Sequence, residues 1–374
     1  MKAAPIDASA GIKSTETPWL RRYVEQILQF FAELDVWRMV PLLAVALLAT
    51  GVAATSSRGG ILALVVSVAA TIAFRSSGRR LPAAILTLTV CGGGVYLQDI
   101  YPDVAVALGK VSNNWAIRRL RKSLFDIYRR CDRMVVLSSD MKALLLDSGI
   151  PDQRVAIIPN WADTQQIIPV ESDNHFRKRF GLEAKFVVMY SGNLGLTQRL
   201  EEFVEAAAIL REDSMIQFVF VGQGARRKDL QQQVDALGLS NVMFCDYQPL
   251  DELSHSLSAG DLHLVPLTAE LSRCLMPSKL YGILAAGRPF LTNAPQTSEL
   301  YEVTKSHNVG FTVEAGSPEL IAQAVLAASN DCVGLKEMGQ RARTLAEEKY
   351  SKSRSVAAFA QTLGEVVGEY SEFR

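Results

Sequence analysis

Four short stretches place small, polar and basic residues where an apolar run gives way to a helical pattern. They read YSGNLG (190–195), FVGQGARRKDL (220–230), CDYQPLDEL (245–253) and MPSKLYGILAAGRP (276–289). Glycine lets the backbone approach a ligand closely, and the first turn of a following helix leaves N–H groups free for an anion. These stretches favour phosphate binding. YSGNLG alone also fits a plain tight turn, and the basic residues after FVGQG also fit a solvated helix face.

The last of these stretches places a lysine where a helix does not favour one. Pro277 suits the position before or at the start of a helix, and the Ser278 hydroxyl is expected to cap it. Lys279 then falls in the first turn, where the helix dipole disfavours a cation by about 0.3–1 kcal/mol. A bound phosphate removes that conflict, so the pattern hints at an anion site.

The chain lacks the sequence patterns of several other chemistries. It contains no G-x-S-x-G elbow, no G-x-x-x-x-G-K-[ST] loop and no G-x-G-x-x-G fingerprint with a distal acid, which argues against hydrolase, P-loop and dinucleotide-binding functions. Its histidines have no ligand spacing, so no metal site is expected. Its scattered cysteines suit buried thiols in a reducing compartment. Lysine plus arginine equal aspartate plus glutamate at 39 each, so the net charge does not favour nucleic acid.

Alternating strand and helix patterns position the four stretches. VYLQ, RMVVLS and RVAIIPN are expected to be strands, separated by the helical segments IRRLRKSLFDIYRRC and SDMKALLLDSG. After a polar segment at 163–185, a second series begins with the strand FVVMYSG and continues through PFLTN and VGFTV to closing helices. We therefore predict an α/β protein with two doubly wound parallel sheets. Ligands of such sheets bind at the carboxyl ends of strands, here in the cleft between the two domains.

The first hundred residues follow a different pattern. Residues 1–38 form a polar lead and an amphipathic helix, without a secretory signal. Three apolar runs follow at 39–54, 61–74 and 81–97, each shorter than the ~20 apolar residues that a bilayer crossing needs. They fit buried elements of an α/β domain, or a membrane-embedded hairpin if the first two runs are tilted or extended.

From about residue 98 to residue 359, the chain resembles bacterial glycosyltransferases of family four. The closest branch is the one that builds cell-surface polysaccharide, the colanic-acid and N-acetylfucosamine transferase group. The matching stretches, in order, are QDIYPDVAVALG, RRCDRMVVLS, IPNWAD, YSGNLGLTQRLEEFVEAA, FVGQG, YQPLDEL, SAGDLHLVPL and MPSKLYGILAAGRP. The resemblance implies a GT-B fold, two Rossmann-like domains facing a cleft, with a nucleotide-sugar held mainly by the C-terminal one. It also implies retention of the sugar's configuration and a departing diphosphate stabilised by positive groups and helix N-termini, without a metal.

The sequence pattern and the resemblance together predict four parts of the chain. They are a leader with an amphipathic helix (1–38), an acceptor-side Rossmann-like domain (39–165, apolar over 39–97), a nucleotide-sugar-binding domain (166–346) and a C-terminal helix packing back on the N-terminal domain (347–374). The family's glycine-rich opening loop is not found, so we expect a truncated or rebuilt N-terminal domain, with apolar segments that are candidates for membrane embedding.

Several family residues differ here, although this branch commonly shows some of the same substitutions. The usual pair of glutamates corresponds to Cys274 and Gly282, and the usual arginine and lysine correspond to Asn193 and Gln198. This leaves Ser278 and Lys279 as the expected main ligands of the diphosphate. The residues that the resemblance implies for donor binding are Gly192, Asn193, Gln198, Gln223, Arg227, Gln248, Pro277, Ser278, Lys279 and Leu280.

Two acids and one basic helix indicate the acceptor side. Asp99 and Asp103 follow a strand end and are candidate catalytic residues that orient or deprotonate an acceptor hydroxyl, or else they cap the next helix. A helix predicted at 115–134 is basic and amphipathic, which suits an anionic membrane surface better than nucleic acid. Its basic residues are Arg118, Arg119, Arg121, Lys122, Arg129, Arg130 and Arg133.

These patterns and the resemblance together predict a glycosyltransferase of the hexosyl- or N-acetylhexosaminyl-transferase type. It would use a UDP-linked sugar and a lipid-linked or polysaccharide acceptor in cell-envelope polysaccharide synthesis, at the cytoplasmic face of the membrane. The altered N-terminus and missing glutamates leave an alternative open. In that alternative, the protein is a catalytically impaired, membrane-associated subunit that binds nucleotide-sugars or acts as a scaffold.

Overall fold

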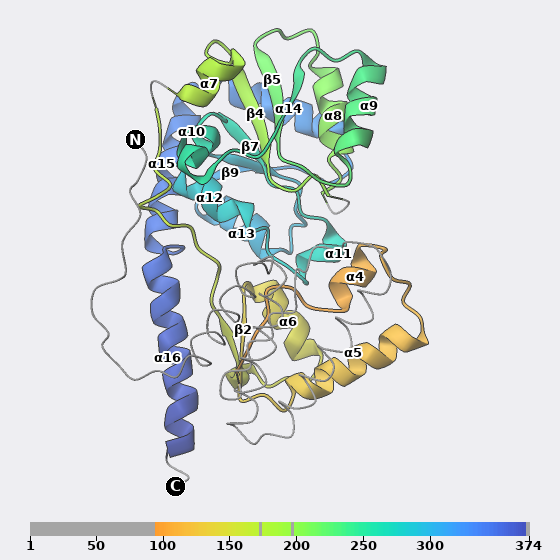
Figure 1. Cartoon of the computed structure of the whole chain (residues 1–374), viewed down its shortest axis with the longest axis vertical. Coiled ribbons are helices and arrows are strands. Elements are labelled where there is room, and N and C mark those ends of the chain that lie inside the picture. The colour runs from red at the N-terminus through yellow and green to blue at the C-terminus, as the bar shows by residue number, and fades with distance from the viewer. Residues whose placement is uncertain (1–93, 172–173, 196–197, 372–374) are drawn as a thin grey trace, which may run out of the picture. The chain divides into compact units, whose positions relative to one another are not determined.

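The computed structural model describes residues 94–171, 174–195 and 198–371 (Figure 1). The predicted leader, the apolar runs at 39–54 and 61–74 and most of the run at 81–97 lie outside the described residues. In the described part of the chain, no helix combines the length and apolarity that a membrane crossing requires.

The first described unit is a parallel β-α-β-α-β arrangement, as the sequence pattern predicts. Its three strands pair in the order β1-β2-β3, and their bounds are β1 (Gly94–Tyr96), β2 (Arg133–Val136) and β3 (Val155–Ile157). The connecting helices are α4 (Asp103–Ala107), α5 (Trp115–Tyr128), α6 (Ser139–Asp147) and the 3-10 turn η1 (Asp152–Arg154). Helix α5 ends before the expected residue 134.

The second sheet contains six described strands, all parallel, in the order β6-β5-β4-β7-β8-β9. They are β4 (Phe186–Ser191), β5 (Ile216–Val221), β6 (Val242–Cys245), β7 (Leu262–Leu264), β8 (Phe290–Thr292) and β9 (Gly310–Thr312). The chain progresses outward from β4 in one direction to β6 and then in the other to β9. The carboxyl end of β4, between β5 and β7, is therefore the point where a doubly wound sheet binds ligands.

Alternate side chains of the central strands enter two separate cores. Val188 and Tyr190 pack in one cluster with residues of α8 (Glu201–Ile209), α9 (Arg227–Leu237) and α14 (Pro318–Ser329). Val187 and Met189 pack in the other cluster with Phe176 of α7 (His175–Phe180). Figure 1 shows α8, α9 and α14 beside the strands. This alternation is the period of two that strands covered on both faces require.

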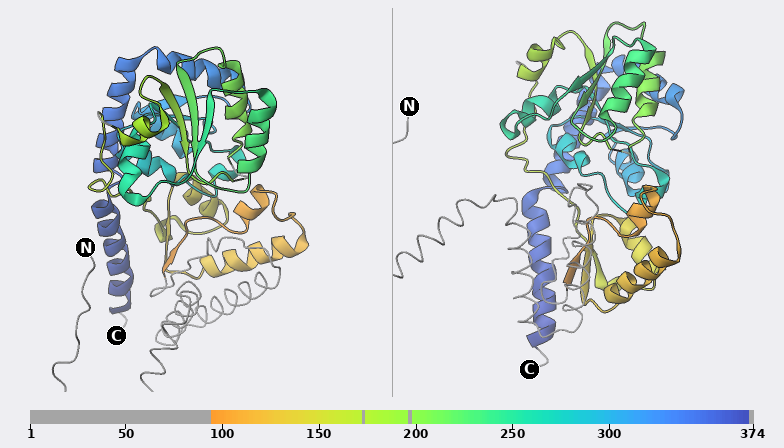
Figure 2. Two further views of the ribbon diagram at one scale, coloured as in Figure 1. Left: turned by 45° about the horizontal axis from the view of Figure 1, so that its top comes forward. Right: turned by 45° about the vertical axis from the view of Figure 1, so that its right-hand side comes forward.

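The remaining described helices complete the second unit and lead to the C-terminus. Their bounds are η2 (Leu250–Glu252), α10 (Leu253–Ser258), α11 (Ala269–Ser272), α12 (Lys279–Ala285), α13 (Glu299–Ser306), α15 (Cys332–Glu348) and α16 (Lys352–Ser371). Helix α16, the long dark-blue helix of Figure 2, contacts the β1–β3 unit. Its Ser355 hydroxyl donates to the Pro159 carbonyl (3.1 Å), and the Phe359 and Tyr96 rings meet edge to face.

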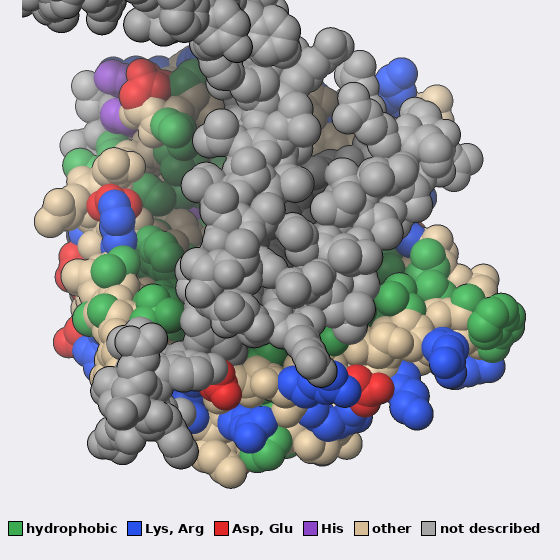
Figure 3. Space-filling view, turned by 60° about the horizontal axis from the view of Figure 1, so that its bottom comes forward, with side chains coloured by type: hydrophobic (Ala, Val, Ile, Leu, Met, Phe, Trp, Pro, Cys, Tyr) green, Lys and Arg blue, Asp and Glu red, His purple; other side chains and the backbone are tan. Residues whose placement is uncertain are grey.

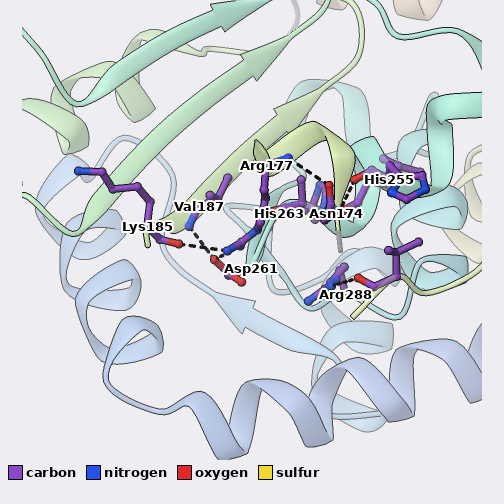
Figure 4. A network of polar contacts seen from close by, with 11 residues as sticks. Asn174, Arg177, Lys185, Val187, His255, Asp261, His263 and Arg288 are labelled. Carbon is purple, nitrogen blue, oxygen red and sulfur yellow. Dashed lines mark hydrogen bonds and ion pairs between the residues drawn. The ribbon is translucent and has the colours of Figure 1, made fainter. Parts of the chain in front are cut away.

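The polar segment 163–185, which lies between the two predicted series of strands, contains the short helix α7. The Asn174 side chain accepts a hydrogen bond from the Arg177 amide (3.1 Å) and so caps α7, which ends at Gly181 in a left-handed conformation. Arg177 forms an ion pair with Asp261, whose carboxylate also accepts from the Val187 amide (Figure 4). This network fastens α7 to the starts of β4 and β7.

Candidate active site

Two glycine turns lie backbone to backbone at the carboxyl ends of β4 and β5. Gly192 and Gly222 have φ angles of +144° and +145°, a region that favours glycine. The Gly192 amide donates to the Val221 carbonyl (2.9 Å). A methyl group added to Gly222 would lie 2.0 Å from the Gly192 carbonyl oxygen. Both the conformation and the lack of space therefore require glycine at position 222.

Further hydrogen bonds hold the two turns together. The Leu194 amide donates to the Gln223 carbonyl, and the Arg226 amide donates to the Leu194 carbonyl, each over 2.9 Å. The Tyr190 hydroxyl donates to the Asn193 carbonyl (2.7 Å). These contacts fix the conformation of the turn after β4 at the carboxyl ends of the strands. A pre-formed turn of this kind suits the binding of an anionic ligand.

Lys279, at the start of α12, reaches the turn after β4. Its Nζ lies 3.7 Å from the centroid of the Tyr190 ring. A Cβ atom at Gly192 would lie 3.3 Å from its Cε and 3.5 Å from its Nζ. Among the described residues no carboxylate forms an ion pair with Lys279, and burial lowers the pKa of its amine to about 7. The structure therefore holds a half-buried amine, without a counter-ion from the described residues, beside a glycine turn.

The neighbours of Lys279 in sequence have other surroundings. Ser278 is exposed, and it makes no capping hydrogen bond, so the predicted hydroxyl cap is wrong. The reason is that Ser278 already has helical angles (φ −62°, ψ −26°), whereas a capping residue is extended. The Leu280 amide donates to the Pro277 carbonyl (3.2 Å), and the Leu280 side chain is buried. Pro277 and Leu280 therefore shape the turn, while the Ser278 hydroxyl stays available to a ligand.

Three predicted donor ligands on the next two loops are already engaged with Asp246. Gln223 donates to the Asp246 carboxylate (2.7 Å), and Arg227 forms an ion pair with the same carboxylate and donates to the Gly222 carbonyl (3.0 Å). Gln248 donates to the Asp246 carbonyl (2.8 Å). These contacts link the loops after β5 and β6. Arg227 thus has a structural partner, unlike Lys279.

Asn193 and Gln198 meet beside Gly195. A Cβ atom at Gly195 would lie 2.9 Å from the Asn193 Nδ2 and 3.1 Å from the Gln198 Oε1. The Gln198 Oε1 is buried, and no described residue donates a hydrogen bond to it. The structure thus brings both side chains to the turn after β4, and it leaves a buried acceptor there.

The two positions where the wider family carries glutamate hold no carboxylate here. A Cβ atom at Gly282 would lie 3.4 Å from the Leu257 Cδ1 and 3.9 Å from the Ile167 Cδ1. Cys274 is buried, and burial raises the pKa of its thiol to about 11. Neither position carries a charge at neutral pH.

The two candidate acids before and in α4 differ in their partners. Asp103 accepts from the Arg121 Nε through both carboxylate oxygens (2.8 and 2.9 Å). Asp99 lies in a β-bridge with Leu275, is half-buried, and forms no ion pair with a described residue. Burial raises the pKa of its carboxyl group. No side chain caps α4. Asp99 is therefore the acid whose carboxylate stays available near the 274–279 segment.

Sequence reasoning did not identify two aromatic residues of this site. Tyr190 is fully buried beneath Lys279, and Tyr247 lies next to Gly222 with 53% of its surface exposed. Tyr190 ends an apolar run and Tyr247 closely follows one, so in the sequence both look like ordinary core residues. Within the described ranges, no group of three His, Cys, Asp or Glu side chains is arranged to hold a metal ion.

Comparison with known proteins identifies the family. The model of Glycosyl transferases group 1 matches residues 172–345, and that of Glycosyltransferase Family 4 matches residues 104–166. WbjE of Pseudomonas aeruginosa, assigned as a glycosyltransferase, is 25% identical over 276 residues, 73% of this chain and 68% of WbjE. WcaI of Escherichia coli (strain K12), assigned to colanic acid biosynthesis as a glycosyl transferase, is 30% identical over 277 residues, 71% of this chain and 66% of WcaI.

A solved structure, that of Anabaena HepE in complex with UDP-glucose, shares the fold with a TM-score of 0.62 at 18% identity, covering 73% of this chain and 72% of that one. The chain thus spans about two thirds of the length of these two curated relatives. The two family models, the curated relatives and the paired parallel sheets lead to one conclusion: the chain belongs to the family-four glycosyltransferases of GT-B fold and is a glycosyltransferase.

Proposed function

We propose that this protein transfers a sugar from a UDP-linked donor to a growing cell-envelope polysaccharide or its lipid-linked precursor. The observation that carries the proposal is the Lys279 amine, held beside the Gly192 turn at the carboxyl end of β4 without a carboxylate partner from the described residues. The complex of HepE with UDP-glucose and the assignment of WcaI to colanic acid biosynthesis support the choice of donor and pathway class.

In the proposed mechanism, the chain stabilises the leaving group rather than supplying a nucleophile. Negative charge grows on the diphosphate as the glycosidic bond breaks, and fixed positive groups in a site of low dielectric stabilise that charge most strongly. Lys279 and the Ser278 hydroxyl would contact the diphosphate. Gln223 and Gln248 would face the rest of the nucleotide, while Arg227 holds their loops together. Retention of configuration and transfer without a metal remain implications of the family resemblance.

Nucleotide binding is tested by thermal unfolding of the whole chain with UDP and with uridine. A ligand present at 100 times its Kd stabilises the folded state by about 2.7 kcal/mol. We expect UDP at millimolar concentration to raise the unfolding midpoint, and we expect uridine at the same concentration to raise it much less. Equal shifts would show that the diphosphate makes no contact of its own, and no shift with UDP would reject the donor.

Asp99 is the residue we propose for orienting the acceptor hydroxyl. Replacing it with asparagine should reduce the rate of transfer by roughly 10- to 100-fold, because a hydrogen bond to a charged group contributes roughly 1.5–3 kcal/mol. Binding of UDP, measured by calorimetry, should stay unchanged. The matched control is Asp103→Asn, which breaks the pair with Arg121 and should lower stability more than turnover. A larger loss of turnover in the control than in Asp99→Asn would reverse the assignment.

Helix α5 is the surface that we propose for contact with anionic lipid at the cytoplasmic face of the membrane. Its side chains Trp115 and Leu120 are 74% and 40% exposed, and the same helix carries Arg118, Arg119, Arg121 and Lys122. The side of the molecule at the bottom of Figure 1, where α5 lies, carries many Lys and Arg side chains (Figure 3). Exposed aromatic and aliphatic groups on a helix that also carries basic residues suit a headgroup interface, where a lipid-linked acceptor would be presented.

Vesicle flotation tests this surface. Each basic residue near an anionic bilayer contributes about 1 kcal/mol, so replacing Arg119 and Lys122 with glutamine should weaken binding to phosphatidylglycerol vesicles about 30-fold. The matched control replaces Arg211 and Lys336 with glutamine. Both residues are exposed and lie outside α5, so the control variant has the same net charge as the test variant. Equal weakening by both pairs would indicate a response to net charge alone.

A second candidate function keeps nucleotide-sugar binding without turnover. It is favoured by Gly282 and Cys274, which stand where the family carries glutamates and have no charge to offer. Transfer or hydrolysis of any nucleotide-sugar by the purified chain would reject it, whereas UDP binding without either reaction would support it.

A further inference from the structure

Tyr190 is a buried side chain with two polar contacts at the proposed diphosphate site. It ends β4, has no measurable exposure, and packs against the Phe220 ring at a centroid distance of 6.2 Å. The face of its own ring lies under the Lys279 Nζ, and its hydroxyl donates to the Asn193 carbonyl. Packing in the core explains the contact with Phe220, but it does not require the other two.

The ring face fills the place that a carboxylate takes in an ordinary ion pair. The ammonium group lies 3.7 Å from the ring centroid, well within the ~6 Å over which a ring quadrupole attracts a cation. Among the described residues no acid competes for it. A carboxylate partner would neutralise the lysine and repel a phosphate, whereas an aromatic ring fixes the position of the ammonium group and leaves its charge for the ligand.

The hydroxyl acts on the other half of the site. Burial raises the pKa of the Tyr190 phenol, so the hydroxyl stays protonated and donates to the Asn193 carbonyl (2.7 Å). That contact fixes the turn that begins at Gly192, the residue whose missing side chain leaves room for the tip of Lys279. One side chain therefore sets both the position of the cation and the conformation of the turn.

We propose that Tyr190 is a positioning residue for the donor diphosphate: its ring holds the Lys279 ammonium group over the Gly192 turn, and its hydroxyl fixes that turn. The inference rests on the proposed use of a UDP-sugar. It assigns a role in binding to a side chain that its burial alone would place in the core.

The groups around Lys279 make donor binding dependent on pH. The Tyr190 ring faces the Lys279 amine from β4, and the Gly192 backbone faces it from the following turn. Tyr247, next to Gly222, adds to the effect of burial in raising the pKa of the Tyr190 phenol. Burial is the one cause that displaces the pKa of Lys279, which lies at about 7 without ligand. A bound diphosphate favours the charged amine, so binding takes up a proton above pH 7. Affinity then falls about tenfold per pH unit as the pH rises above 7, until the pKa of the bound state is reached.

The test measures UDP-glucose affinity by calorimetry in variants that keep the aromatic ring at position 190 and change only its substituents. The series is wild type, Tyr190→Phe, and 3,4,5-trifluorophenylalanine at position 190, which keeps the ring but weakens its quadrupole. We expect the fluorinated variant to bind about fivefold more weakly than Tyr190→Phe at pH 6.5, where Lys279 is mostly protonated. Thermal unfolding midpoints of the two ring variants should agree, which excludes a loss of core packing.

Repeating the same series in a protein that also carries Lys279→Met shows whether the ring affects binding through the lysine. In the Lys279→Met background, fluorination should have no effect on UDP-glucose affinity, and the decrease of affinity above pH 7 should disappear. Equal losses in both backgrounds, or no loss in either, would overturn the inference. A wild-type protein that binds no UDP-glucose would reject the proposed function instead, so the two failures are distinguishable.

Discussion

Replacing Gly222 with alanine is expected to lower the thermal unfolding midpoint by about 10 °C. The new methyl group would lie 2.0 Å from the Gly192 carbonyl oxygen, at a φ of +145° that alanine rarely adopts. Backbone strain of this kind costs about 1–3 kcal/mol, and the clash adds to it because the neighbour is backbone and not a flexible side chain. Each kcal/mol corresponds to roughly 2–4 °C in a domain of about 150–250 residues, such as the one that contains the second sheet.

The matched control is Gly238→Ala at the end of α9. Gly238 also has a positive φ, +62°, but a methyl group there meets no atom within 4 Å. We expect a loss of only about 1 kcal/mol and an unchanged affinity for UDP. Gly222→Ala should also weaken UDP binding, because the Gly192 turn must move away from the methyl group. Similar shifts for the two variants would mean that the turns are not packed backbone to backbone in solution.

The central strands of the second sheet could be predicted because burial on both faces leaves a mostly apolar run. FVVMYS and IQFVFV are such runs, and they form β4 and β5 as expected. The short helix α7 could not be predicted in the same way. It has one buried residue, Phe176, and its stability comes from the Asn174 cap and the Arg177–Asp261 pair. The Arg177–Asp261 pair joins residues 84 positions apart in the sequence, so no local pattern reveals it.

The roles of the residues predicted to bind the nucleotide-sugar could be read from the sequence to different extents. Gly192 and Lys279 were predicted from their residue types at strand and helix ends, and the structure brings them into contact. Arg227 was predicted from its charge, but its partner Asp246 lies on another loop, so its structural role needed the fold. The Ser278 cap was wrong because a residue's type does not show whether its backbone is extended or helical.

Replacing Lys279 with alanine should weaken UDP-glucose binding about 100-fold at pH 6.5. Charge-assisted hydrogen bonds contribute roughly 1.5–3 kcal/mol each, and in this site the lysine has no carboxylate among the described residues that offsets its charge. Arg227→Ala is the matched control. Its guanidinium already pairs with Asp246 and the Gly222 carbonyl, so its loss should lower affinity much less, through loosening of the loops. Equal effects would refute this ranking.

The free protein offers an independent readout of the same lysine. With its pKa lowered to about 7 in the folded state and an ordinary value of 10.5 when unfolded, the unfolded chain binds more protons between these two values. Stability without ligand therefore gains from this group as the pH rises from about 7 towards 10.5, because stability increases wherever the unfolded state holds more protons. Lys279→Met should remove that gain and should stabilise the free protein at neutral pH while it weakens UDP-glucose binding. Opposite changes in stability and affinity are the signature of a group that is buried for a ligand rather than for the fold, and urea unfolding at pH 6.5 and pH 9 measures them.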